Sequence, residues 1–266
     1  MVNNKTKKKG ENFMEYLLNN VLAERPNKTV YYEEGKTIKL FNDSYPASQI
    51  LNEALSQTRV SEETNLRIPK LIEVTKLMGR WAIVSEFIEG KTLECMMNEN
   101  PEKIDEYMDL FVNIQMQILS NRVPLLGRIK EKFRRKLTET ELIDNDIKYE
   151  LLQRLEGMKN HFKLCHGDFN PSNVIIGQNG DWYVIDWAHA TQGNASADAA
   201  RTFLLFSMQG RKELAEKYLK VFEEKSTITK HEVQRWIPIV AATQLTKGKE
   251  EEKAFLSEWI NVVEYQ

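Results

Sequence analysis

The residues with the clearest chemical potential stand in two short stretches, HGDFNPSNVII (166–176) and WYVIDW (182–187). The first holds His166, Asp168 and Asn173, and the second holds Asp186. Carboxylate and amide oxygens suit a hard divalent cation such as Mg²⁺, and an aspartate can also take a proton from a hydroxyl group. We therefore ask whether the chain brings the two stretches together.

A β-hairpin over 174–185 is expected to do so. Asn179-Gly180 is a strong signal for a two-residue turn, because both central positions need a positive φ. With the turn centred there, Asn173 is predicted directly opposite Asp186, with Cβ atoms about 4.5–5.5 Å apart. These two side chains would then share a divalent cation, and Asp168 would face the same cleft. The alternative for each residue alone is a polar loop with a capping Asn and a strand-end Asp.

His166-x-Asp168 followed by Asn173, and then Ile185-Asp186-Trp187, resembles the catalytic segment of the aminoglycoside phosphotransferase and choline kinase family, whose fold is related to that of protein kinases. The resemblance implies that Asp168 orients an acceptor hydroxyl group and takes its proton. It implies that Asn173 and Asp186 hold Mg²⁺ on the phosphates of the nucleotide, and that His166 supports the loop. It spans most of the chain, about 20 to 245, but is specific only around 164–187.

The same resemblance predicts supporting residues elsewhere in the chain. Lys39 on a strand is expected to bind the nucleotide phosphates, and Glu53 on the following helix is expected to pair with Lys39 and fix its side chain in the nucleotide site. Glu86 and Ile88 would offer backbone groups to the adenine ring. Asp198, early in a later helix, would brace the catalytic loop.

Two features depart from the pattern of protein kinases. No glycine lies between Gly10 and Gly35, so the glycine-rich loop that covers the phosphates is missing, and Asn27–Thr29 are candidates for a weaker cover. Trp187-Ala188 stands where protein kinases carry Phe-Gly. The second departure favours the small-molecule branch of the family.

The elements that must position these residues change in character near residue 90. Strands are expected within 29–41 and 81–88, with a helix beginning near Pro46 between them. Helices are expected over 103–120, 128–138, 141–160, 196–208, 211–225 and 230–246. The predicted fold class is α+β: a two-lobed protein-kinase-like fold, with a small β-rich lobe (1–89) and a larger, mostly helical lobe (90–266).

Composition excludes several other classes of protein. A net charge of −2 over 266 residues gives no reason to expect a nucleic-acid or membrane partner, and no apolar run approaches the ~18 residues of a membrane span. The two cysteines, Cys95 and Cys165, have no metal-binding spacing and are expected to be reduced, which predicts a cytoplasmic protein. Whether the protein is a monomer or a dimer does not follow.

Three further groups leave alternatives open. The basic run KEKFRRK (130–136) is most simply a solvated helix face, with binding of an acceptor phosphate as the alternative. Trp187, Trp236 and Trp259 are either core residues or walls of an acceptor pocket. The acidic stretch Glu250–Glu252 is either a solvated helix start or an attraction for an amine-bearing substrate.

The sequence thus predicts an ATP-dependent, or GTP-dependent, phosphotransferase that moves the γ-phosphoryl group to a hydroxyl group of a small molecule. The alternative is a non-catalytic nucleotide-binding protein that keeps the fold as a sensor or interaction module, for which the missing glycine-rich loop is the support. A protein kinase is disfavoured, because no activation segment from Asp-Phe-Gly to Ala-Pro-Glu follows Asp186. The identity of the acceptor does not follow from the sequence.

Overall fold

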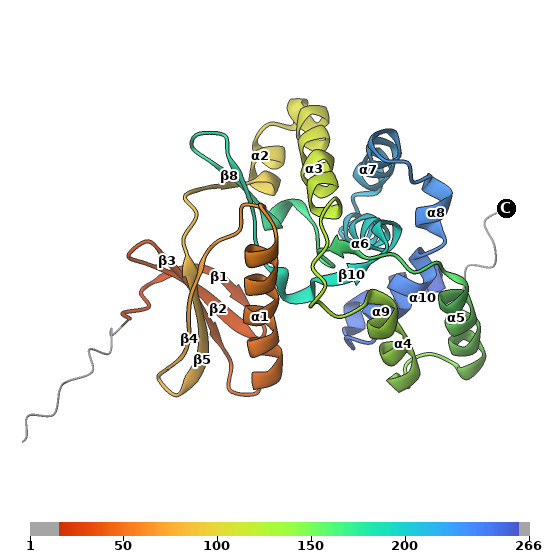
Figure 1. Ribbon diagram of the computed structural model, residues 1–266, viewed down its shortest axis with the longest axis horizontal. Coiled ribbons are helices and arrows are strands. Elements are labelled where there is room, and N and C mark those ends of the chain that lie inside the picture. Colours follow the sequence, from red (N-terminus) through yellow and green to blue (C-terminus); the bar gives the residue numbers. More distant parts are fainter. Residues whose placement is uncertain (1–15, 261–266) are drawn as a thin grey trace, which may run out of the picture.

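The computed structural model describes residues 16–260 and shows the two lobes expected of a protein-kinase-like α+β fold (Figure 1). The small lobe is an antiparallel sheet with strand order β1-β2-β3-β5-β4 and one helix. Its elements are β1 (Asn20–Arg25), β2 (Lys28–Glu33), β3 (Lys36–Phe41), α1 (Ala47–Glu63), β4 (Leu71–Leu77) and β5 (Arg80–Glu86). The predicted strands and helix are confirmed, while β1 and β4 were not foreseen.

Strand alternation in β3 decides where its lysine points. Ile38 and Leu40 are buried on one face of the sheet, with Ala82 and Val84 of β5. Phe41 lies on the opposite face, in a cluster with Ile50 and Ala54 of α1. Because successive side chains alternate between faces, Lys39 shares the face that α1 covers. The helix also contacts the segment around Trp187–His189 of the large lobe, so this face looks toward the other lobe (Figure 1).

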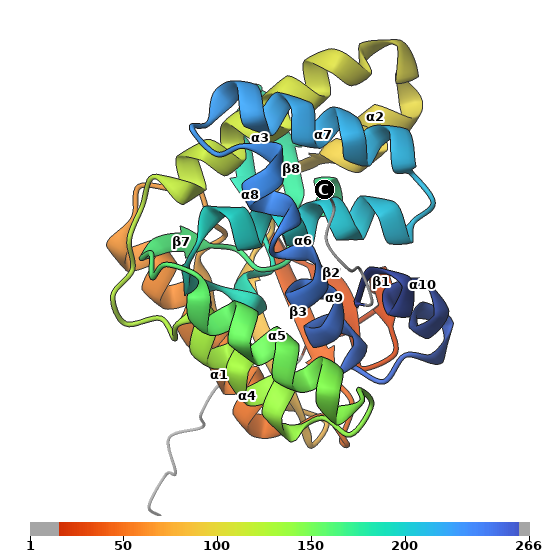
Figure 2. The same ribbon diagram turned by 90° about the vertical axis from the view of Figure 1, so that its right-hand side faces the viewer.

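The large lobe is mostly helical, as predicted. Its helices are α2 (Leu93–Glu99), α3 (Ile104–Leu119), α4 (Ile129–Glu139), α5 (Asn145–Gly157), α6 (Ala195–Met208), α7 (Lys212–Lys225), α8 (Lys230–Gln234), α9 (Ile237–Leu245) and α10 (Glu250–Ile260). Helix α6 is buried along most of its length and contacts α7, α8 and α9, which places it in the middle of the lobe (Figure 2).

The helix predicted over 230–246 is instead two helices, α8 and α9. Pro238 lies in the first turn of α9, where its missing N–H costs nothing, but inside a continuous helix it would remove a hydrogen bond and clash with the preceding turn. Helix α2 was not predicted, and α10 begins at Glu250, which agrees with the reading of the acidic stretch as a helix start. Within residues 16–260, no helix has the length and apolar character needed to cross a membrane.

Two small sheets hold the loops that carry the predicted site. Strands β6 (Gly90–Thr92), β8 (Val174–Gly177) and β9 (Trp182–Val184) form one, and β7 (Lys163–Cys165) pairs with β10 (Thr191–Gly193) in the other. The loop after β7 and the loop after β9 therefore emerge side by side. They carry the two stretches from which the site was predicted.

The hairpin register differs by one residue from the prediction. Val174 pairs with Val184, so Asn173 lies opposite Ile185, whose N–H donates to the Asn173 carbonyl at 3.0 Å. The turn contains three residues, 178–180, and only Gly180 among them has a positive φ, of 83°. One left-handed residue after an ordinary turn closes such a loop, so Asn179 need not adopt that conformation. Asp186 is consequently one position beyond the paired residues.

Candidate active site

A cleft lies between the sheet of the small lobe and the β8–β9 hairpin of the large lobe. Its volume is about 440 Å³, within the range of about 300–1,000 Å³ typical of small-molecule sites. Its walls include Lys28, Lys39, Glu86, Phe87, Ile88, Asn173 and Asp186. The structure thus brings Lys39, Glu86, Ile88, Asn173 and Asp186 into one cleft with Lys28, a candidate for covering the phosphates, while Glu53 lies behind Lys39.

The predicted contact between Lys39 and Glu53 is present. Lys39 Nζ donates to Glu53 Oε1 at 2.6 Å and lies 3.6 Å from Asp186 Oδ1. Burial alone would lower the pKa of Lys39, but the charges of Asp186 and Glu53 outweigh burial and raise that pKa above its ordinary value. The ammonium group therefore stays charged inside the cleft. Its contact with a nucleotide phosphate stays a prediction.

Lys28 supplies a second cation at the same place. It begins β2, directly after the turn that replaces a glycine-rich loop, and its Nζ lies 3.7 Å from Glu53 Oε1 and 3.6 Å from Asp186 Oδ2. Two lysines thus converge on two carboxylates.

Asp186 has a backbone conformation that is rare for a residue with a side chain. Its φ and ψ are both 63°, in the left-handed region, and such strain is concentrated at functional sites. Burial would raise its pKa, but the charges of Lys39 and Lys28 dominate and hold the pKa below its ordinary value. The carboxylate is therefore ionised, which is the form that binds a cation.

The donor set fits Mg²⁺ that is shared with a nucleotide. The Asn173 side-chain amide donates to the Asp168 carbonyl at 2.9 Å, which leaves its own oxygen as the group able to bind a cation. Within residues 16–260, no cluster of three or more His, Cys, Asp or Glu side chains could hold a metal ion alone. One carboxylate and one amide oxygen are the sparse protein contribution that Mg²⁺ takes when phosphates and water complete its shell.

His166 ties the catalytic loop to the end of β9. Its ring is fully buried, Nε2 donates to the Ile185 carbonyl at 3.0 Å, and Nδ1 accepts from the Asp168 N–H at 3.3 Å. The ring also lies against Trp187, with 4.6 Å between ring centroids. Both ring nitrogens are engaged by the backbone, an arrangement that supports the loop and leaves neither nitrogen for proton transfer.

Gly167 is required between His166 and Asp168. Its φ is 78°, and a Cβ at this position would lie 2.5 Å from the carbonyl oxygen of His189. Its N–H donates to Asp198 Oδ1 at 2.7 Å, and Gln115 donates to Asp198 Oδ2 at 3.3 Å. Burial raises the pKa of Asp198 against these hydrogen bonds. Asp198 therefore contacts the loop that carries Asp168 directly.

Asp168 is held by an arginine to which the sequence gave no role. Arg201 Nη2 donates to Asp168 Oδ1 at 2.9 Å, and 27% of the Asp168 side chain remains exposed. Burial would raise the pKa of Asp168, but the charge and hydrogen bond of Arg201, together with other neighbouring positive charges, keep the pKa below its ordinary value. The spacing of three residues between Asp198 and Arg201 on α6 was the available signal, since residues so spaced share a helix face.

The segment after β5 lines the cleft as expected, and each of its residues makes a different kind of contact. The Phe87 N–H donates to the Gly35 carbonyl at 2.9 Å, so it belongs to the sheet. The Glu86 carboxylate accepts from the Lys70 N–H at 3.3 Å. Ile88 is buried and lines the cleft. Their contact with a base stays a prediction.

The three tryptophans line neither this cleft nor the pocket beside the Asp168 loop, formed by α4, α6 and α9. Trp187 is buried and its Nε1–H donates to the Val184 carbonyl at 3.0 Å. Trp236 packs against Phe133, and Trp259 packs against Phe203. Of the two readings left open by the sequence, the structure supports the core role.

Fold and cleft together define a two-lobed kinase-like protein with a nucleotide-sized cleft between its lobes. The family model described as "Phosphotransferase enzyme family" matches residues 25–235. That is well over half of the chain, so the chain belongs to this family and the protein is a phosphotransferase.

Solved structures agree on the fold at low sequence identity. A thermostable mutant of aminoglycoside phosphotransferase APH(4)-Ia, in ternary complex with ADP and hygromycin B, superposes with a TM-score of 0.68 at 13% identity, covering 91% of both chains. A choline/ethanolamine kinase family protein from Mesorhizobium loti gives a TM-score of 0.61 at 11% identity, covering 90% of this chain and 87% of that one. No curated protein matches the chain by sequence.

Proposed function

We propose that the protein transfers the γ-phosphoryl group of ATP, or of GTP, to a hydroxyl group of a small molecule in the presence of Mg²⁺. The observation that carries the proposal is the cleft in which Lys39, Glu53, Asn173 and Asp186 converge beside the loop of Asp168. In the division proposed here, residues 1–89 bind the nucleotide and residues 90–266 supply Asp168 and the acceptor site. The superposed phosphotransferase with ADP and hygromycin B supports this arrangement by analogy.

Lys39 and Lys28 would neutralise the phosphates of the nucleotide, taking over contacts that they now make with Asp186. Asn173 and Asp186 would then hold Mg²⁺, which neutralises the charge that develops on the phosphoryl oxygens. Glu86 and Ile88 would bind the base through the backbone. Because the base contacts decide between adenine and guanine, affinities for ADP and GDP are to be compared directly.

Asp168 would orient the acceptor hydroxyl group and take its proton. The new bond joins the acceptor oxygen to the γ-phosphorus, the bond from that phosphorus to the bridging oxygen breaks, and the nucleoside diphosphate leaves with the electron pair. Arg201 keeps Asp168 ionised and fixes its orientation. His166 and Asp198 would hold the loop in place through the backbone contacts described above.

The test is Asp168→Asn, which keeps the size of the side chain but loses its charge. We expect phosphoryl transfer to fall about 10²–10⁴-fold, the usual contribution of a general base, with nucleotide affinity nearly unchanged. Asp181→Asn, directly after the hairpin turn, is the matched control, because the Asp181 carboxylate contacts Asn179 and Arg67 and is not among the residues that line the cleft. Release of ADP or GDP is measured with purified full-length protein and a panel of neutral, cationic and anionic hydroxyl compounds.

Transfer at the wild-type rate by Asp168→Asn would remove Asp168 from the mechanism. Tight nucleotide binding without transfer to any acceptor of the panel would instead favour the non-catalytic sensor.

A further inference from the structure

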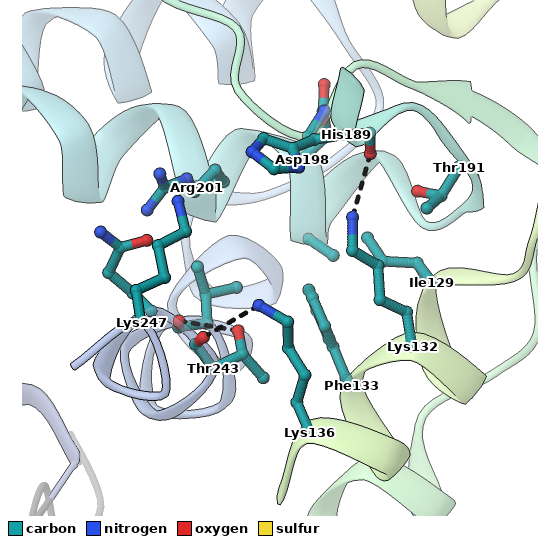
Figure 3. A pocket seen from close by; sticks show the side chains of 14 residues that line it. Ile129, Lys132, Phe133, Lys136, His189, Thr191, Asp198, Arg201, Thr243 and Lys247 are labelled. Atoms are coloured by element: carbon teal, nitrogen blue, oxygen red, sulfur yellow. Dashed lines mark hydrogen bonds between the residues drawn. The ribbon is translucent and has the colours of Figure 1, made fainter. Parts of the chain in front are cut away.

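A second pocket lies beside the Asp168 loop, between α4, α6 and α9 (Figure 3). Four of its lining side chains are cationic: Lys132 and Lys136 of α4, Arg201 of α6, and Lys247, which follows α9. Arg201 is the residue that holds Asp168, so the pocket adjoins the proposed site of proton removal. A pocket in this position, next to Asp168, is where the acceptor molecule would bind.

The lysines of this pocket have no acidic partners within the part of the chain that the structure describes. Lys132 donates to the His189 carbonyl at 3.2 Å and Lys136 to the Thr243 carbonyl at 3.4 Å, the dashed lines of Figure 3. Neither they nor Lys247 forms an ion pair among residues 16–260. The hydrogen bonds of Lys132 and Lys136 therefore go to neutral carbonyl groups, although the charge of Asp168 also acts on Lys132 and Lys247.

The carboxylates nearest to the pocket are already engaged. Asp168 accepts from Arg201, Asp198 accepts from Gly167 and Gln115, and Glu252 accepts from Gln244 and Lys249. Asp168 and Glu252 lie near enough for their charges to act on Lys247, but among residues 16–260 neither forms an ion pair with any of the three lysines. The side chains of the pocket therefore carry an excess of positive charge.

Two buried polar atoms at the wall of this pocket lack any hydrogen-bond partner. They are Arg201 Nη1 and Thr191 Oγ1, and both residues are more than nine-tenths buried. A buried donor without a partner carries the full cost of its desolvation, so native proteins rarely leave one. Two unsatisfied atoms from different elements, in one pocket, indicate a ligand that accepts hydrogen bonds.

The electrostatics of the pocket agree with this reading. Burial, followed by the neighbouring charges of Lys136, Lys247 and Arg201, lowers the pKa of Lys132 to about 7. Burial and the charge of Arg201 lower the pKa of Lys247 to about 8. His189 adds no charge, because burial and then Lys132 and Lys247 lower its pKa to about 3. The cations repel one another, and a bound anion would relieve that repulsion.

We infer that the hydroxyl acceptor carries an anionic group, a phosphate or a carboxylate, that binds between Lys132, Lys136, Lys247 and Arg201. This inference rests on the proposed function, since it takes Asp168 as the group that meets the acceptor hydroxyl. The pocket has a volume of about 50 Å³, and one water molecule needs about 10–15 Å³ by such a measure. The space therefore admits a phosphate or carboxylate group, with the rest of the acceptor extending toward Asp168.

The same charges exclude an amine-bearing acceptor. A polycationic aminoglycoside or choline would meet like charges in this pocket, and like charges brought together cost binding free energy. The acidic stretch Glu250–Glu252 does not offset them, because Glu252 is held by Gln244 and Lys249. The acceptor of this chain therefore differs in charge from the hygromycin B of the superposed structure.

The inference is tested by measuring which small molecules bind to the full-length protein. The anions are inorganic phosphate, ribose 5-phosphate, glucose 6-phosphate and gluconate. Ribose and glucose serve as uncharged controls, and choline serves as a cationic control. Isothermal titration without nucleotide measures affinity. We expect the anions alone to bind, and Lys136→Met and Lys247→Met each to weaken that binding about 10- to 100-fold, the usual loss for a hydrogen bond between charged groups. Comparing the affinities of the phosphate compounds with that of gluconate shows whether the pocket prefers a phosphate or a carboxylate.

Two further variants locate the bound anion. Arg134→Met removes a charge from the same helix, but Arg134 pairs with Glu156 on the surface, so anion affinity should not change. Lys39→Ala removes a cation from the nucleotide cleft and should also leave anion affinity unchanged. Loss of phosphate binding in Lys39→Ala, or equal affinity in Lys136→Met, Lys247→Met and wild type, would overturn the inference.

Transfer assays separate this inference from the proposed function. Phosphorylation of a neutral or cationic compound, with no binding of any anion in the pocket, would leave the phosphotransferase role intact and refute the anionic acceptor. Anion binding that depends on Lys136 and Lys247, without transfer to any hydroxyl compound, would support the pocket and remove the catalytic proposal for Asp168.

Discussion

Replacing Lys132 with methionine should stabilise the protein when no anion is bound. A pKa near 7 in place of the ordinary 10.5 means that the folded state disfavours the charged form. At about 1.4 kcal/mol for each pH unit, the upper bound on this cost is about 5 kcal/mol. Solvent screening at the pocket mouth and loss of about 1 kcal/mol for the hydrogen bond to the His189 carbonyl reduce the net gain to about 1–2 kcal/mol.

The gain should depend on pH in a defined direction. Below about pH 7, Lys132 is protonated in both the folded and the unfolded state, and wild type bears the whole cost. Between about pH 7 and 10.5, the folded state releases a proton that the unfolded state keeps, so the free energy of unfolding of wild type rises with pH. The difference between Lys132→Met and wild type should therefore close over that interval.

Thermal and urea unfolding at several values from pH 6 to 10 measure this difference. At about 2–4 °C for each kcal/mol, the melting temperature of Lys132→Met should exceed that of wild type by roughly 2–8 °C at pH 6. Addition of a binding anion should reduce or reverse this difference in melting temperature, because only wild type retains all four cations that bind the anion. Arg134→Met should show no such pH-dependent gap. A Lys132→Met protein that is less stable than wild type at pH 6, or a gap that persists at pH 10, would refute the reasoning.

Three other substitutions test the remaining parts of the site. Asp186→Ala should abolish most of the Mg²⁺-dependent gain in nucleotide affinity, and an unchanged calorimetric affinity would show that Asp186 is not a ligand. Lys39→Ala should slow transfer while circular dichroism and melting temperature stay close to wild type, because Lys28 remains beside Glu53; a large loss of stability would mark Lys39 as structural. Gly167→Ala should cost about 1–3 kcal/mol of stability and most of the activity, since its φ is positive and its Cβ would meet the His189 carbonyl; an active, equally stable variant would contradict the close approach.

Much of the fold and part of the site could be predicted from local patterns. Helical spacing allowed Glu53 to look toward the sheet, but the expectation that it pairs with Lys39 came from the resemblance to the kinase-like family; the contact is present. The motif around His166, Asp168, Asn173 and Asp186 indicated the family, and the family model confirms it.

The hairpin register could not be fixed in the same way. A signal at Asn179-Gly180 is compatible with a two-residue turn and with a three-residue turn that uses only the glycine. The choice depends on pairing of β8 with β6 as well as with β9, and β6 comes from a distant part of the chain. Because a shift of one residue moves every side chain to the opposite face, this tertiary pairing decides what faces the cleft.

The cationic pocket could not be predicted from local sequence patterns, because it depends on how distant helices pack. The basic run 130–136 contains Lys132 and Lys136 four residues apart, which by itself predicts only that they share a helix face. The simpler expectation was that this helix face is solvated. Arg134 of the same helix agrees with that expectation, because it pairs with Glu156 at the surface. The two lysines instead face Arg201 of α6 and Lys247 beyond α9 (Figure 3). Charges that repel one another can be gathered only where the packing of whole helices supplies the energy, and no local sequence signal reports that balance.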